Sequence, residues 1–389
     1  MPKPDDGVDI LYRLSPNQRT ILDLIRSQDN VSRTELSRLS GLTPGALSRH
    51  VKELLAHSLV EEGERRSGHR GQPALPISIR ANAAYSIGIS FSLHEIEVVA
   101  IDFRGHVVAE LTEPFAFADV GGLTAQCAGL VARIEAGPEL RGARILGVGI
   151  AVPGYFQSDA PVRMETFDVL TALAGVDLEV FRAAFDRPTW VENNSSAAAL
   201  AEFYNRSDPG VRNLVLVNVG YGFSAGFMID GRLYRGRGGN AGEVGLLYPR
   251  GAARPSALDL VRTLAQAGRP VGSMSELSGR VLSGDPVIGD WVTRAGDQLR
   301  RVMNVIDFTI APDEIVLGGQ IPTELVRQLD DAIAGRSEPG MDRRFRRRIS
   351  GLGPMASAIG AAFLPVYSTS SPMLGTAAPA AQSLNHALL

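Results

Sequence analysis

Two short helices with strong start signals follow one another between residues 32 and 56, and they limit what the N-terminal region can fold into. Ser32 and Glu35 form a capping box, in which the hydroxyl accepts a backbone N–H and the carboxylate reaches back to the cap. Gly41 can adopt the left-handed backbone conformation that ends the first helix, and Thr43-Pro44 starts the second helix. Two helices joined by a glycine-containing turn predict a helix-turn-helix, with the second helix in the DNA major groove.

The flanking segments favour a winged helix-turn-helix over a plain helical bundle. An apolar stripe within residues 17–30 predicts one more helix before the pair. Residues 59–62 and 75–79 predict two strands, and the glycine-rich, basic segment 63–73 between them predicts the wing. From residue 30 to residue 80 there are eight Lys and Arg against five Asp and Glu, a weak positive excess that fits nucleic-acid binding.

The residues expected to contact DNA lie at the helix starts, on the second helix and in the wing. Arg49 can make a bidentate contact to guanine, although a solvated or phosphate-contacting arginine is an equal alternative. Arg70, flanked by glycine, can approach a narrow minor groove or phosphates. The candidate DNA-binding residues are Ser32, Arg33, Thr43, Gly45, Ala46, Ser48, Arg49, Lys52, Arg65, Arg66 and Arg70.

The remainder of the chain contains an internal repeat. Residues 85–111 and 213–236 each contain two β-rich runs, a turn of small residues and a hairpin signal, and each is followed by a helix-rich stretch. Two similar units predict two lobes of related α/β fold. A cleft between lobes is a common place for a small ligand to bind.

Several long motifs resemble those of the ROK family (repressors, open reading frames and sugar kinases), in the family's order. They are GVGIAVPGYF (147–156), VENNSSAAALAEF (191–203), VNVGYGFSAGFMIDGRLYRGRGGNAGEVGLL (217–247) and DFTIAPDEIVLGGQI (307–321). The resemblance implies an N-terminal winged helix-turn-helix followed by a duplicated, two-lobed actin-like ATPase fold. We expect a flexible N-terminus (1–14), the DNA-binding domain (15–80), lobe 1 (81–195), lobe 2 (196–366) and a disordered tail (367–389).

The resemblance also implies that the kinase chemistry is lost. The family's catalytic base is the aspartate of an Asn-Asp pair, which here is Asn193-Asn194, and an amide cannot accept the proton. The first phosphate loop corresponds to 90–95 (SFSLHE), which lacks the family's acidic residue, glycines and lysine. The second corresponds to Gly220-Tyr221-Gly222, where the family's threonine is absent. We therefore expect no catalytic residues, no cofactor and no enzymatic activity.

The family's zinc site is missing as well. Its histidine corresponds to Leu246, and the cysteine-rich loop corresponds to 248–259, which has no cysteine. Ligand identity decides zinc binding, so we expect no metal.

Carried over by position, the family's sugar contacts correspond to Asn193, Asn194, Glu243, Leu246 and Asp259. The four polar ones, Asn193, Asn194, Glu243 and Asp259, are the candidate ligand-binding residues, because amides and carboxylates hydrogen-bond sugar hydroxyls. The alternative is structural: Glu243 braces a hinge and Asn193 stabilises a helix start.

These expectations combine into a repressor of carbohydrate-related genes that binds double-stranded operator DNA and responds to a small carbohydrate, as a homodimer or dimer of dimers. The alternatives are control by a protein partner with a vestigial cleft, and an active sugar kinase with a DNA-binding arm. The single cysteine, Cys127, and the absence of a signal pattern or an apolar run of ~20 residues favour a cytoplasmic protein with no membrane partner.

Overall fold

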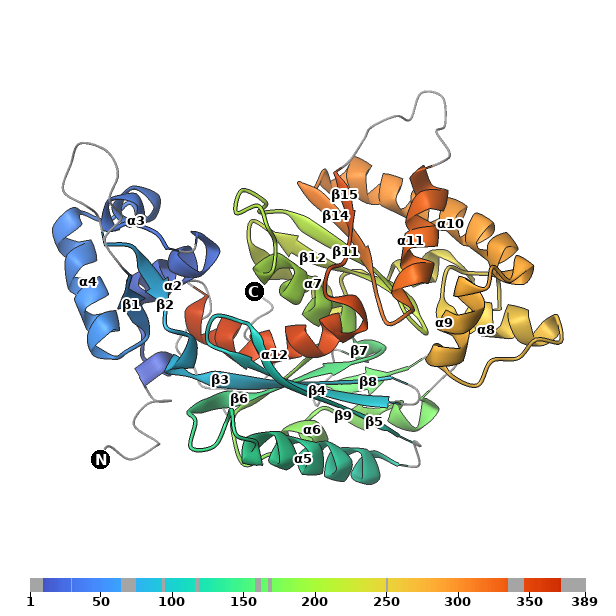
Figure 1. Cartoon of the computed structure of the whole chain (residues 1–389), viewed down its shortest axis with the longest axis horizontal. Coiled ribbons are helices and arrows are strands. Elements are labelled where there is room, and N and C mark those ends of the chain that lie inside the picture. The colour runs from blue at the N-terminus through green and yellow to red at the C-terminus, as the bar shows by residue number, and fades with distance from the viewer. Residues whose placement is uncertain are drawn as a thin grey trace.

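The computed structural model describes residues 10–371 except 29, 64–74, 93–94, 116–118, 158–161, 167–169, 250 and 335–345. Figure 1 shows an N-terminal domain, in blue, beside a larger body built around two sheets, with the red helix α12 lying along the lower sheet. Within the described ranges, no helix combines the length and the apolar character needed to cross a bilayer.

The N-terminal domain is a winged helix-turn-helix. Its elements are α2 (Pro16–Gln28), α3 (Arg33–Ser40), α4 (Pro44–Ala56) and the antiparallel strands β1 (Val60–Glu62) and β2 (Ile77–Ile79). The predicted helix signals are confirmed: Ser32 and Glu35 form the capping box, Gly41 ends α3 in the left-handed region with φ of 69°, and Thr43 caps α4. These local signals succeed because each one satisfies backbone groups that the helix end leaves unpaired.

The packed region begins inside the segment that was expected to be flexible. Among residues 10–14, Leu11 and Leu14 are buried. The ring of Tyr12 stacks on that of Trp190, with 6.5 Å between the ring centroids. Residues 10–14 therefore do not fit the expected flexible segment, because they cover apolar surface of lobe 1 that a local sequence pattern does not reveal.

The two lobes contain five-stranded sheets of the same topology, which confirms the duplication. In lobe 1 the order is β10-β6-β3-β4-β5, and in lobe 2 it is β15-β14-β11-β12-β13 when read from the equivalent edge. Each sheet is an antiparallel meander extended by two parallel strands. The strands are β3 (Tyr85–Phe91), β4 (Glu95–Asp102), β5 (Val107–Pro114), β6 (Ile145–Val152) and β10 (Thr189–Asn193), then β11 (Leu214–Val219), β12 (Phe223–Ile229), β13 (Arg232–Tyr234), β14 (Glu314–Gly318) and β15 (Arg347–Ile349).

Helices cover the outer face of each sheet and bury an apolar core beneath them. On lobe 1 the cover is α5 (Val120–Ala136), with α6 (Glu179–Ala183) and a small sheet of β7 (Tyr155–Gln157), β8 (Arg163–Glu165) and β9 (Val176–Asp177) beside it. On lobe 2 the cover is α8 (Ala257–Gln266), α9 (Met274–Leu282), α10 (Pro286–Ile310) and α11 (Thr323–Ala334).

Two helices, α7 (Asn194–Tyr204) and α12 (Ala356–Ser370), pack against each other between the sheets. Glycine makes this approach possible, since a Cβ at Gly360 would lie 1.7 Å from the carbonyl oxygen of Ala197, and one at Gly149 would lie 1.8 Å from that of Ala361. Helix α12 thus packs on the lobe 1 sheet, although the expected boundaries assign its start to lobe 2 and its end to the tail. The expected boundary at residue 366 is wrong for a physical reason: α12 continues to Ser370, where it is buried.

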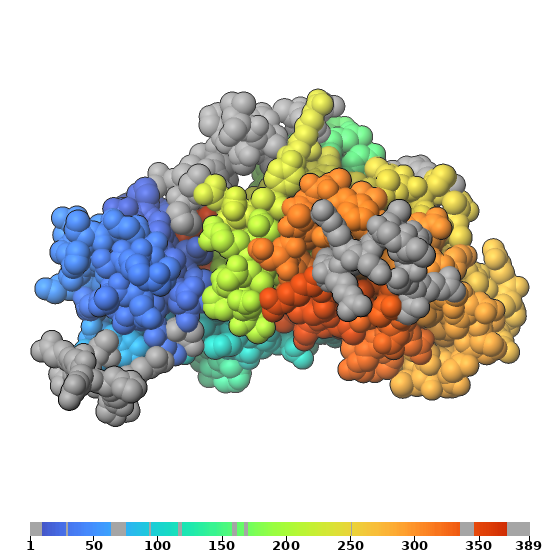
Figure 2. All heavy atoms as spheres, turned by 90° about the horizontal axis from the view of Figure 1, so that it is seen from above, coloured from blue at the N-terminus to red at the C-terminus, as the bar shows by residue number. Residues whose placement is uncertain are grey.

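The winged domain is joined to the lobes by buried polar contacts from α2. Arg19 donates to the carbonyl oxygen of Ser368 at 2.8 Å, and Arg26 donates to that of Phe103. Asp23 accepts a hydrogen bond from Tyr204, the last residue of α7. One continuous apolar cluster extends from the winged domain into α7 and α12. Figure 2 shows the blue domain lying directly against the rest of the molecule.

Candidate functional site

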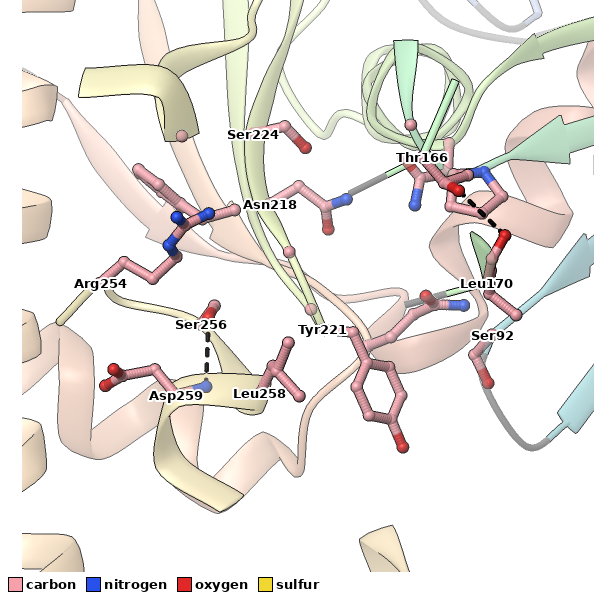
Figure 3. Close-up of a pocket in the computed structure, with 18 of the residues that line it drawn as sticks. Ser92, Thr166, Leu170, Asn218, Tyr221, Ser224, Arg254, Ser256, Leu258 and Asp259 are labelled. Atoms are coloured by element: carbon pink, nitrogen blue, oxygen red, sulfur yellow. Dashed lines mark hydrogen bonds between the residues drawn. The ribbon is translucent and has the colours of Figure 1, made fainter. Parts of the chain in front are cut away.

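A pocket opens between the two lobes, and it brings together all four predicted ligand-binding residues. Lobe 1 contributes Phe91, Ser92 and the segment 153–154, and α7 contributes its first turn. Lobe 2 contributes the β11–β12 hairpin, Glu243, part of the loop before α8, and the start of α8. Figure 3 shows Ser92, Thr166 and Leu170 of lobe 1 on one side of the pocket and residues of lobe 2, among them Asn218 and Leu258, on the other.

Asn193 borders the pocket, but its amide is engaged in holding the backbone. Its Oδ1 accepts hydrogen bonds from the N–H groups of Ser195 at 2.8 Å and Ser196 at 3.4 Å, so it is the N-cap of α7. Its Nδ2 donates to the carbonyl oxygen of Gly154 at 2.7 Å. The structural alternative considered for Asn193 therefore describes its position, and a ligand would meet only what remains of its hydrogen-bonding capacity.

Asn194 is the first residue of α7 and faces the pocket. Next to it, Ser195 Oγ accepts from Asn218 Nδ2 at 2.9 Å and contacts Ser224 Oγ. Asn218 and Ser224 are directly paired on β11 and β12, and both line the pocket. Sequence reasoning missed them, although Asn218 interrupts an otherwise apolar strand, which is the signal that would have identified it.

Glu243 is the polar group most available to a ligand. It lines the pocket, and among the described residues its carboxylate makes no hydrogen bond or ion pair. Burial raises the pKa of Glu243 to about 7 from its ordinary value of 4.5. The group can thus serve as hydrogen-bond donor or acceptor near neutral pH, which suits hydroxyl recognition.

Asp259 also lines the pocket, but its carboxylate is turned into the packing of lobe 2. Asp259 Oδ2 accepts from Trp291 Nε1 at 2.8 Å and from the guanidinium of Arg294. The carboxylate of Asp259 is therefore less available to a ligand than the sequence prediction assumes. Leu246, at the position of the family's zinc-binding histidine, is 63% exposed beside the pocket.

At residues 90–97, which begin with the segment that the resemblance aligns with the first phosphate loop, a glutamine bridges the lobes. Gln320, just after β14, donates from Nε2 to Ser90 Oγ and to Glu97 Oε2, each at 3.3 Å. Burial raises the pKa of Glu97 to about 7. Sequence reasoning missed this contact because it joins residues more than two hundred positions apart.

Some of the predicted DNA-binding residues have structural roles, and others are exposed on α4. Ser32 and Thr43 cap helices, and Arg33 forms an ion pair with Glu62 at 2.6 Å. On α4, Gly45, Arg49 and Lys52 are exposed, while Ala46 and Ser48 are partly covered. Neither Arg49 nor Lys52 has an acidic partner among the described residues. The wing residues Arg65, Arg66 and Arg70 lie outside the described residues.

Comparison with known proteins finds two family models that match this chain. The family model described as "ROK family" matches residues 127–365, more than half of the sequence. The chain belongs to the ROK family. A second model, "Winged helix-turn-helix DNA-binding", matches residues 14–61 of this ROK protein.

Its relatives include a protein from Sinorhizobium fredii described as "Uncharacterized protein y4fQ", which is 33% identical over 92% of both chains. The transcriptional repressor Mlc of Escherichia coli is 24% identical over 88% of this chain and 91% of its own. The xylose repressor of Bacillus subtilis is 25% identical over 62% of each.

Solved structures show the same fold. A ROK transcriptional regulator described as a homologue of Escherichia coli Mlc superposes with a TM-score of 0.66 at 22% identity, covering 94% of this chain and 98% of its own. A ROK glucokinase from Streptomyces griseus, in complex with glucose and AMPPNP, superposes with a TM-score of 0.60 at 20% identity, covering 72% of this ROK protein and 99% of the kinase.

Proposed function

We propose that this ROK protein is a sequence-specific DNA-binding transcriptional repressor of carbohydrate-related genes, and that its cleft binds a sugar or sugar derivative without phosphorylating it. The observation that carries the proposal is a capped α4 whose exposed Arg49 and Lys52 have no acidic partner among the described residues. The domain that contains α4 packs against a two-lobed body with a polar cleft. Relatives that cover most of the chain or its larger part carry the printed names of repressors, one of them a xylose repressor.

The cleft supports binding better than catalysis. Phosphoryl transfer to a sugar needs a base for the attacking hydroxyl and a cradle for the phosphates. The position of the base holds Asn194, and a missing general base typically costs roughly 10²–10⁴-fold in rate. The Gln320 amide also reaches across to Ser90 in the place where the resemblance puts the first phosphate loop.

Helix α7 is the element through which we expect the cleft to affect the winged domain. Its first turn, at Asn194, borders the pocket, and its last residue, Tyr204, hydrogen-bonds to Asp23 on α2. A ligand that changes the distance between the lobes moves both ends of this rigid helix together. Such a ligand shifts DNA affinity only as far as its own affinity differs between the two lobe arrangements.

The remaining proposals concern assembly and location. A homodimer or dimer of dimers in the cytoplasm would present paired α4 helices to operator half-sites one or two helical turns apart. Operator symmetry then mirrors the symmetry of the protein.

Operator selection with the full-length protein tests the function. Random-sequence DNA is enriched on the protein, and the enriched site is measured by fluorescence anisotropy. Arg49→Ala should weaken binding to the enriched site by roughly 5- to 150-fold, the value of one bidentate base contact, with little effect on random DNA. Lys52→Ala should weaken binding to the enriched site and to random DNA alike. It should also reduce the slope of log affinity against log salt concentration by about one.

Arg327→Ala provides the matched control, because it removes the same charge from an exposed position on α11. Its binding to both kinds of DNA should equal that of the parent. Failure of the protein to enrich any sequence would contradict a regulatory role.

A further inference from the structure

The lobe 2 wall of the cleft carries two arginines that have no acidic partner within the described part of the chain. Arg254 and Arg262 both line the pocket. Arg254 donates from Nη2 to the carbonyl oxygen of Pro249 at 3.3 Å, and Arg262 is exposed on α8. Among the described residues, no carboxylate lies within ion-pair distance of either guanidinium.

Two other arginines of lobe 2 illustrate the ion-paired alternative. Arg269 pairs with Asp285 and Arg280 with Glu276, each at 2.9 Å. Arg254 and Arg262 differ from these two in having no counter-ion among the described residues, and they differ from the exposed Arg327 of α11 in lining the pocket.

The carboxylates nearest in the lining do not neutralise these two arginines. Asp259, three residues before Arg262, gives its Oδ2 to Trp291 and Arg294. Glu243 makes no ion pair among the described residues, and burial favours its neutral form. This part of the cleft thus presents two cations to whatever binds there.

Both arginines lie in the part of lobe 2 that contains α8 and the loop before it. Leu258 and Arg262 lie four residues apart on α8, so they share the helix face that borders the pocket, and Arg254 precedes the helix. Figure 3 shows the Arg254 side chain extending from that loop toward the side of the cleft where Asn218 lies. Guanidinium groups bind carboxylate and phosphate oxygens in a bidentate manner.

We propose that the ligand of this cleft is a monosaccharide derivative that carries an anionic group, a phosphate or a carboxylate, held by Arg254 and Arg262. The inference rests on the proposed sugar-binding function and narrows its ligand class. The hydroxyl groups of the ligand would face Asn194 and Glu243, and its anion would face the two guanidinium groups.

The test measures thermal stability and then dissociation constants of the full-length protein with matched probes. The probes are glucose, glucose 6-phosphate and glucuronate; N-acetylglucosamine and its 6-phosphate; xylose and xylonate; and inorganic phosphate alone. The variants are Arg254→Gln, Arg262→Gln and the double variant, with Arg327→Gln as a matched exposed arginine on α11. Circular dichroism confirms that each variant is folded.

We expect an acidic or phosphorylated sugar to raise the melting temperature where its neutral counterpart does not. Each cleft variant should weaken that sugar at least about tenfold, the value of one charged hydrogen bond, while Arg327→Gln leaves it unchanged. Comparison of the phosphorylated with the carboxylate probes identifies the anion.

Three outcomes would overturn the inference. If neutral sugars bind as tightly as their anionic counterparts, the inference is wrong but sugar sensing stands. If the double variant still binds the anionic sugar with the parent's affinity, the inference is wrong in the same way. If no probe binds, both the inference and the sensing part of the function fail, whereas operator binding is judged by its own experiment.

Discussion

At the scale of single residues, the cleft combines groups of very different freedom. The amide of Asn193 caps α7 through Oδ1 and bonds to Gly154 through Nδ2, and Asp259 is bonded to Trp291 and Arg294. Glu243 has no partner among the described residues. Ligand affinity should therefore respond most strongly to substitution of Glu243, although the sequence motifs treat these positions alike.

One prediction concerns Asn194. Asn194→Asp restores the carboxylate of the kinase pair, but we expect no ATP-dependent phosphorylation of any sugar probe, because Ser90 replaces the acidic residue of the phosphate loop and hydrogen-bonds to Gln320. A coupled assay of ADP release, with the parent protein as baseline, measures this. Sugar-dependent turnover in the variant would show that the phosphate site still works.

A second prediction concerns the protonation of Glu243. Its pKa is about 7 in the folded protein and near 4.5 when unfolded, so between these values the folded state keeps a proton that the unfolded chain has lost. The free energy of unfolding therefore falls as pH rises through this window. Glu243→Gln cannot ionise. The difference between its melting temperature and that of the parent should therefore shift in favour of the variant from about pH 5 to pH 7 and stay constant above that. A difference that does not vary with pH would contradict the raised pKa.

At the scale of elements, the two central helices determine how closely the lobes approach. Helices α7 and α12 meet where Gly360 faces the backbone of Ala197, and α12 in turn lies on Gly88 and Gly149 of the lobe 1 sheet. The absent side chains allow backbone to pack against backbone. Any side chain at these positions must displace a whole helix, since interiors are packed as densely as crystals.

Gly360→Ala should therefore destabilise the protein by more than about 2 kcal/mol, the upper part of the range for overpacking. Gly289→Ala is the matched control, because Gly289 is also inside a helix, α10, and a Cβ there would meet nothing within 4 Å. The control should be neutral or stabilise by up to about 1 kcal/mol, the difference in helix propensity. Urea unfolding measures both, and equal effects would contradict the close approach.

The elements also show what a sequence alone can predict. The caps of α3 and α4, the hairpin signal within residues 213–236 and the repeated meander depend on neighbouring residues, and all of them are confirmed. The packing of α12 on lobe 1, the burial of Leu11 and the Gln320 contacts depend on distant residues, and no local pattern indicates them. In the site, the four residues carried over from the family by position do line one pocket. Which of them is available to a ligand depends on hydrogen-bond partners that the sequence does not reveal.

At the scale of the whole molecule, the winged domain and lobe 1 share one apolar cluster. Trp190 lies at their junction against Tyr12, and Trp291, the other tryptophan of the chain, lies inside lobe 2. Each tryptophan can therefore report on a different part of the molecule.

We expect the winged domain and lobe 1 to unfold together. In Trp291→Phe, fluorescence reports only the junction at Trp190, and its thermal transition should coincide with the loss of helix seen by circular dichroism. Calorimetry should show no separate, early transition for a domain of the size of residues 15–80. A low-temperature step that leaves Trp190 fluorescence unchanged would show that the winged domain unfolds on its own.

The shared cluster has a consequence for how such proteins diversify. A DNA-binding domain joined by a flexible linker could be exchanged between regulators as a unit. Here α2 is built to fit Tyr204, Phe103 and the end of α12, so a transplanted domain would leave buried arginines without their carbonyl partners. Changes of operator specificity in this lineage should therefore accumulate on the outer face of α4 and in the wing, while the inner face of α2 changes only together with α7 and α12.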